Sequence, residues 1–157
     1  MTALAAIRTG HVGVPLFVHV LGAMLLVGTL LVVAAAIVAG WRREEPGDAA
    51  VLTRYALRTV LFGVVPAYVV MRVGAQWTES ASGYPDSFSA TWLDIGYLTA
   101  DAGAVLVLVS IVLAVVGLRR MRSGAGGPRL ARAVGVIAVL LLAAYLVAVW
   151  AMAGKPQ

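Results

Sequence analysis

The sequence predicts an all-α protein, a single integral membrane domain spanning residues 1–157, in which four transmembrane helices form a bundle with both termini outside. The chain is 62% hydrophobic and only 12% charged. Four of its apolar runs approach or exceed the roughly 18 residues that a spanning helix needs. Its arginines gather in segments 42–58 and 119–132, each between two apolar runs, whereas the segment around 78–94 is acidic and has no arginine.

The expected spans are 15–40, 59–76, 95–118 and 133–152. The first ends at Gly40, a residue type common at helix C-termini, followed by an interfacial Trp41. Asp48 is the expected N-cap of the second helix, and Pro66 should kink that helix. Residues 78–93, rich in Ser, Gly, Pro and Asp, are expected to form an ordered external loop over the bundle.

Charge sorting sets the expected orientation, because positively charged loops stay on the cytoplasmic side of a membrane. Nine arginines fall on one side of the predicted bundle: Arg42, Arg43, Arg54, Arg58, Arg119, Arg120, Arg122, Arg129 and Arg132. The net charge of +5 is therefore attributed to topology and lipid headgroups, not to nucleic-acid binding. The composition, rich in Ala, Val and Arg and poor in Lys, is typical of a high-GC bacterium, so we expect a prokaryotic plasma membrane protein.

Three ionisable residues from three helices are expected in one layer within the outer quarter of the bilayer: His19, Arg72 and Asp101. Their depth follows from counting about 20 residues per span from the inner arginines. Asp101 or Asp94 should pair with Arg72, because an unpaired arginine at this depth costs at least a few kcal/mol. The layer also includes residues on the same helix faces or nearby: His11, Gln76, Asp94 and Tyr97.

The layer has three interpretations. It is a structural ion pair, a site that binds a ligand or cofactor, or part of a proton or ion pathway. The pathway is the weakest, because the inner half of every predicted helix lacks ionisable residues.

Haem b is one candidate cofactor. The two histidines, His11 and His19, are eight residues apart on one segment, about 12 Å along a helix, and cannot clamp one iron from both faces. A site with His19 alone stays open, and Gly22 would leave room for a flat ring beside the helix. The sixth ligand would be a methionine or absent; the candidates are Met24, Met71 and Met152.

A copper or zinc site has ligands of acceptable type in His11, His19, Asp94 and Asp101. The chain has no cysteine, which removes thiolate sites and cysteine nucleophiles. It also has no HExxH, GxSxG or Walker motif, so an enzyme is left open but not favoured.

Small residues recur every seven positions in the third predicted span, at Gly96, Gly103, Ser110 and Gly117. Such a seam lets another helix approach closely, either within the bundle or from a second copy or a partner membrane protein. The stretch Val38–Arg43 also echoes Val115–Arg120. A duplicated hairpin explains this echo, and so does chance, since inward-going helices commonly end in a small residue and arginines.

The stretch Val18–Gly28 resembles the first helix of small bacterial membrane proteins of the DUF2269 and CopD-like type, with His19 followed by Gly22 and Gly28. The overall layout of four spans is also similar. The resemblance implies a bacterial plasma membrane protein and, through CopD relatives, a link to copper uptake. A similar helix occurs in HemJ-type haem-binding oxidases, but a second helix-borne histidine and a matching lysine are missing here.

From these observations we expect a small accessory or ligand-binding subunit with a polar site in the outer leaflet. The alternative is a haem- or redox-linked membrane enzyme, or a CopD-like copper permease, that uses His19, Arg72 and Asp101.

Overall fold

The computed structural model describes residues 10–83, 90–124 and 128–154, and these form helices joined by short connections. The elements are α1 (Gly10–Trp41), α2 (Pro46–Thr59), the π-helical segment η2 (Val60–Val64), α3 (Val65–Ser82), α4 (Thr91–Arg122) and α5 (Pro128–Gly154). Because α2, η2 and α3 are continuous, the described chain has four helices long and apolar enough to cross a membrane. The all-helical fold class is thereby confirmed.

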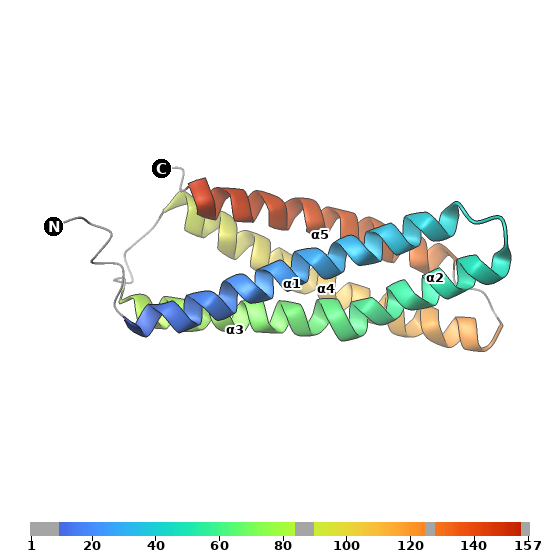
Figure 1. Ribbon diagram of the computed structural model, residues 1–157, viewed down its shortest axis with the longest axis horizontal. Coiled ribbons are helices and arrows are strands. Elements are labelled where there is room, and N and C mark those ends of the chain that lie inside the picture. The colour runs from blue at the N-terminus through green and yellow to red at the C-terminus, as the bar shows by residue number, and fades with distance from the viewer. Residues whose placement is uncertain (1–9, 84–89, 125–127, 155–157) are drawn as a thin grey trace.

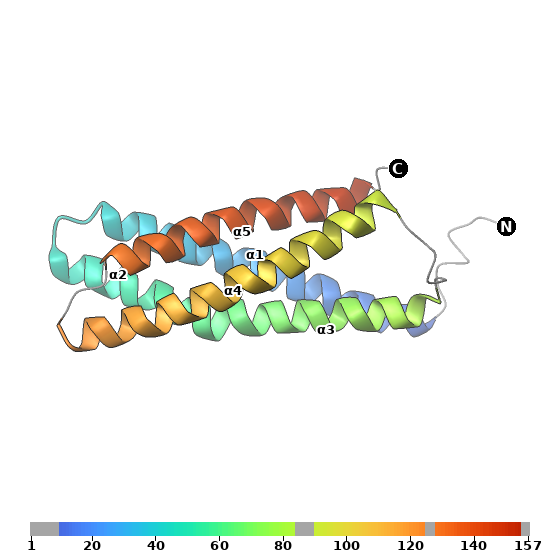
Figure 2. The ribbon, with the colours of Figure 1, turned by 180° about the vertical axis from the view of Figure 1, so that it is seen from behind.

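The four long helices run up and down along one bundle axis (Figure 1). α1 packs against the α2–α3 helix and against α5, while α4 packs against α5 and the α2–η2 part of the second helix. Figure 2 shows α4 diverging from α3 toward the end where α3 stops and α4 starts. Between α3 and α4 themselves, backbone contact is slight.

The two ends of the bundle differ in charge. The end that holds the connections after Trp41 and Arg122 carries all nine of the arginines expected on one side; we call it the basic end. At the opposite end lie Glu79, near the end of α3, and Asp94, in the first turn of α4; we call it the acidic end. The separation matches the predicted charge sorting, and which end faces the cytoplasm stays a prediction.

The helices are longer than the predicted spans. The second helix, predicted over 59–76, is continuous over Pro46–Ser82, 37 residues or about 55 Å. The external loop predicted over 78–93 is correspondingly shorter, since α3 runs to Ser82 and α4 begins at Thr91; residues 84–89 lie outside the described residues. The predicted spans were too short because hydropathy marks only the apolar part of a helix. Polar residues continue the helices beyond these apolar parts.

One local prediction is wrong, and the segment before Pro66 has a feature that was not predicted. Asp48 is not the N-cap of the second helix: Glu45 occupies that position with extended backbone, and Pro46 follows at the first helical residue, where its missing N–H costs nothing. Pro66 lies just after η2. A proline leaves the carbonyl four residues earlier without its partner, and a π turn absorbs that disruption within a continuous helix.

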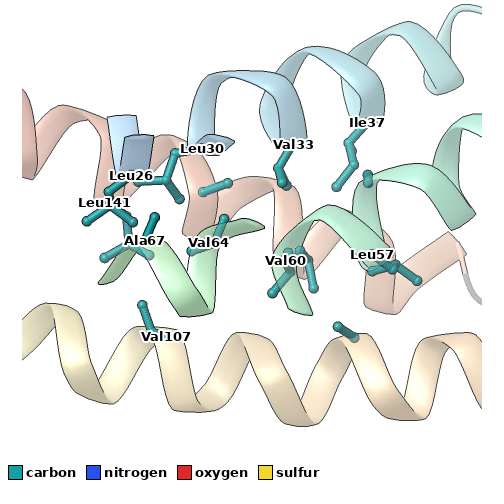
Figure 3. Close-up of a cluster of buried hydrophobic side chains, with 14 of the residues drawn as sticks. Leu26, Leu30, Val33, Ile37, Leu57, Val60, Val64, Ala67, Val107 and Leu141 are labelled. Atoms are coloured by element: carbon teal, nitrogen blue, oxygen red, sulfur yellow. The ribbon is translucent and has the colours of Figure 1, made fainter. Parts of the chain in front are cut away.

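The core is a column of aliphatic side chains from all four long helices (Figure 3). Leu26, Leu30, Val33 and Ile37 of α1 meet residues of the second helix. Val107 of α4 and Leu141 of α5 complete the contacts. Close packing of these side chains joins the four long helices.

The two hairpins bury equivalent positions at a constant offset of 77 residues. Five buried residues of α1 correspond to five buried residues of α4: Leu26 to Gly103, Leu30 to Val107, Val33 to Ser110, Ile37 to Ala114, and Gly40 to Gly117. In the second helix of each hairpin, Leu57, Val64, Met71 and Gly74 correspond in the same way to Val134, Leu141, Ala148 and Ala151. Other buried residues have no buried counterpart, since Ala131 and Gly135 correspond to the exposed Arg54 and Arg58. Because 77 residues are eleven heptads, helices with ordinary burial spacing match at this offset with or without a duplication, and both explanations stay open. The offset pairs the α1–α5 interface with the interface between α4 and the second helix.

Candidate functional site

α1 and α3 cross with their backbones in direct contact. A Cβ added at Gly22 would lie 2.4 Å from the Met71 backbone nitrogen, and one added at Gly74 would lie 2.5 Å from the His19 nitrogen. The two glycines therefore bring the backbones into direct contact at two points of the same crossing. Neither residue was predicted to face α3. The sequence feature that could have indicated this crossing is a glycine close to a polar residue on each helix. Gly22 lies three residues after His19, and Gly74 lies two residues after Arg72.

His19 is fixed by this crossing. Its Nδ1 lies 3.0 Å from the Met71 carbonyl oxygen. Because a carbonyl oxygen only accepts hydrogen bonds, Nδ1 carries the proton, and in the neutral ring Nε2 has the lone pair. The prediction that Gly22 leaves room for a flat ring is wrong, since the α3 backbone fills that space.

Where α3 and α4 diverge, polar side chains connect the two helices. Arg72 of α3 forms an ion pair with Asp101 of α4, one of the two carboxylates expected. The Tyr68 hydroxyl, four residues before Arg72, donates a 3.0 Å hydrogen bond to the Ala100 carbonyl oxygen. Toward the acidic end, the Glu79 carboxylate lies beside Tyr97. Polar bridges thus join two helices whose backbones have moved apart.

The exposure of the ion pair shows that it is not a sealed core feature. The Asp101 side chain is 65% exposed and that of Arg72 28%. The contact joins Arg72 Nη2 to Asp101 Oδ1, so the guanidinium has further N–H donors and the carboxylate a second oxygen for another partner.

Behind these bridges lies Tyr145 of α5, only 5% exposed. Its hydroxyl has no hydrogen-bond partner among the described residues. It sits directly on Gly103, where an added Cβ would lie 2.2 Å from the hydroxyl oxygen, and it is close enough to Tyr68 and Arg72 to interact with them electrostatically. A buried hydroxyl without a partner costs on the order of 1–3 kcal/mol.

The remaining predicted layer residues are placed as follows. Gln76 and Asp94 are exposed, and Asp94 lies on the same face of α4 as Asp101, seven residues away. The side chain of His11 lies outside the described residues. In the part of the chain that the structure describes, no three His, Asp or Glu side chains come together as a metal-binding group, so the structure gives no support to the four-residue metal site.

The small-residue seam of α4 is filled from within this chain. Gly96, Gly103, Ser110 and Gly117 are all buried. Met152 and Tyr145 of α5 lie against Gly96 and Gly103, and Leu57 of α2 lies against Gly117. The seam therefore receives large side chains and is not a free surface for a second copy.

Sequence reasoning missed Tyr68, Glu79 and Tyr145. Tyr68 and Glu79 share the Arg72 face of α3, at spacings of four and seven residues, which was a usable signal. Tyr145 lies in the middle of an apolar run, and nothing in the sequence sets its hydroxyl apart from an ordinary membrane tyrosine.

No family model, no curated protein and no solved structure matches this chain. The resemblance of residues 18–28 to DUF2269 and CopD-like proteins accordingly stays a prediction.

Proposed function

We propose that this protein is a small membrane-embedded binding or accessory subunit of a prokaryotic plasma membrane, with both termini outside. Its site is the polar layer between α3 and α4, which holds the polar part of a ligand or partner in the outer leaflet. The surrounding helices act as a scaffold that sets the distance across this layer.

The observation that carries the proposal is the asymmetry between the two equivalent interfaces. At the 77-residue offset, Asp101 corresponds to Met24 and Arg72 to Val149. The α1–α5 interface thus packs without an ion pair where its counterpart has one. Since an arginine at membrane depth costs a few kcal/mol, a charge that the architecture does not require supports a role in binding.

The test compares the wild type with the double variant Arg72→Val and Asp101→Met, which copies the uncharged half of the molecule. Both are expressed in a bacterial membrane and extracted with surrounding lipid into nanodiscs. Native mass spectrometry and proteomics then identify the small molecules and proteins retained. Arg58→Val, an exposed arginine change at the basic end, is the matched control.

The wild type and the control variant should retain a ligand or partner that the double variant loses, while all three unfold at similar temperatures. The same set of retained molecules on all three would refute the proposal.

A haem-linked redox enzyme is a second candidate, supported by His19. A metal-bound histidine typically donates its other ring N–H to a carbonyl or carboxylate, which orients the ligating nitrogen, and His19 Nδ1 makes this contact with Met71. The absorption spectrum of the purified protein tests it. A Soret band that His19→Ala abolishes would favour this candidate, and a colourless protein would exclude it.

A further inference from the structure

We infer that the ligand of the α3–α4 layer is a zwitterionic glycerophospholipid, held by its headgroup and by an ester carbonyl. This inference rests on the proposed function and names the ligand class. It follows from the order of polar groups along the bundle axis.

The polar groups form three levels, because residue numbers rise toward the acidic end in α3 and α5 and fall toward it in α4. Glu79 and Asp94 lie nearest that end. Arg72 and Asp101 form the second level. The Tyr68 hydroxyl, bonded to the Ala100 carbonyl oxygen, lies at this second level as well. The Tyr145 hydroxyl forms the third level: it lies on Gly103, two residues or about 3 Å further from the acidic end than Asp101.

A glycerophospholipid with an ammonium headgroup carries complementary groups in the same order. Its phosphate matches Arg72, which has N–H donors beyond the one used on Asp101. Its ammonium group matches the exposed Asp101 carboxylate, within the negative field of Glu79 and Asp94. Its ester carbonyls lie one glycerol unit deeper than the phosphate and match the Tyr145 hydroxyl.

Tyr145 decides what is bound at the deepest level. Its hydroxyl is buried and unpartnered among the described residues, and a phenol in an apolar environment is neutral and donates a proton to an acceptor. The neighbouring Tyr68 already donates to Ala100. A carbonyl oxygen supplies the acceptor that Tyr145 lacks and adds no charge to the core.

The charged residues of the two upper levels argue against two other ligands that carry a carbonyl group, an anionic lipid and a quinone. In the described part of the chain the two upper levels hold three carboxylates, Glu79, Asp94 and Asp101, against the single guanidinium of Arg72. An anionic lipid such as phosphatidylglycerol would add a fourth negative charge and offer no cation. A quinone has carbonyl acceptors for Tyr145 and Arg72 but no cation to meet the Asp101 carboxylate.

The test is native mass spectrometry of the full chain after exchange into nanodiscs that contain equal amounts of phosphatidylethanolamine, phosphatidylcholine and phosphatidylglycerol, with ubiquinone added in a separate arm. The wild type should keep one phosphatidylethanolamine or phosphatidylcholine in preference to phosphatidylglycerol. Tyr145→Phe should lower that retention roughly 2- to 10-fold, the value of one neutral hydrogen bond. Tyr55→Phe, a tyrosine change at the basic end at a 57% exposed side chain, should leave retention unchanged.

The outcomes separate this inference from the proposed function. Equal or better retention of phosphatidylglycerol, displacement by ubiquinone, or no effect of Tyr145→Phe overturns the lipid assignment. If Arg72→Val with Asp101→Met loses some other molecule or partner while lipid retention is unchanged, the proposed function stands and the lipid inference fails. If that double variant retains everything that the wild type retains, both fail.

Discussion

The α1–α3 crossing gives the sharpest test of the structure. Gly22→Ala places a methyl group 2.4 Å from the Met71 nitrogen and Gly74→Ala places one 2.5 Å from the His19 nitrogen. Both contacts are with backbone, so no side chain can turn away. The helices themselves must separate.

The required movement sets the magnitude. A Cβ contact needs about 3.4 Å, so either substitution separates the helices by roughly 1 Å. The His19–Met71 hydrogen bond, 3.0 Å in the wild type, would then stretch beyond hydrogen-bonding distance. Overpacking of this kind costs about 1–3 kcal/mol. The double variant should cost less than the sum of the two, because one separation makes room for both methyl groups.

The assay is reversible unfolding in mixed micelles, followed by far-UV circular dichroism as denaturing detergent is added. Gly28→Ala is the matched control on the same helix, since nothing lies within 4 Å of its added Cβ, and it should be neutral or slightly stabilising. If Gly22→Ala and Gly74→Ala unfold like Gly28→Ala, or if their costs add fully, the backbone contact does not exist as described.

Three further predictions concern the polar layer and the topology. Asp101→Met alone should destabilise the bundle by about 1–3 kcal/mol by leaving Arg72 unpaired, and adding Arg72→Val should restore most of that loss; additive losses in the same unfolding assay would show that the pair is not coupled. Gly103→Ala pushes a methyl group into the Tyr145 hydroxyl at 2.2 Å, so its cost should fall when Tyr145→Phe removes that oxygen; an undiminished cost in the double variant would contradict the packing. In intact cells an impermeant thiol reagent should label cysteine at Ser82 and not at Ser123; the reverse pattern would invert the proposed orientation.

The number and order of the helices could be predicted from the sequence because both depend on the hydropathy and charge of continuous segments. Apolar runs near the length of a bilayer gave four helices, and arginine sorting gave the two ends of the bundle. Helix ends were less accurate: Glu79 and Trp92 look like loop residues in a hydropathy profile but are helical in the structure. The ion pair between Arg72 and Asp101 could also be predicted from the sequence, because few charged residues lie within the apolar runs.

The sequence by itself determined how far along the bundle axis each residue lies, since that position is a count of residues along a helix. Only the tertiary structure decided which faces meet. It placed Gly22 against Met71 instead of a cofactor ring and filled the α4 seam with Tyr145 and Met152. It also left only slight backbone contact between α3 and α4, which polar side chains bridge. Contacts of this kind depend on the rotation and crossing of each helix, to which residues far apart in the chain contribute together. No single apolar run records these contacts. The Tyr145 hydroxyl, which has no hydrogen-bond partner among the described residues, was therefore found only in the packed bundle.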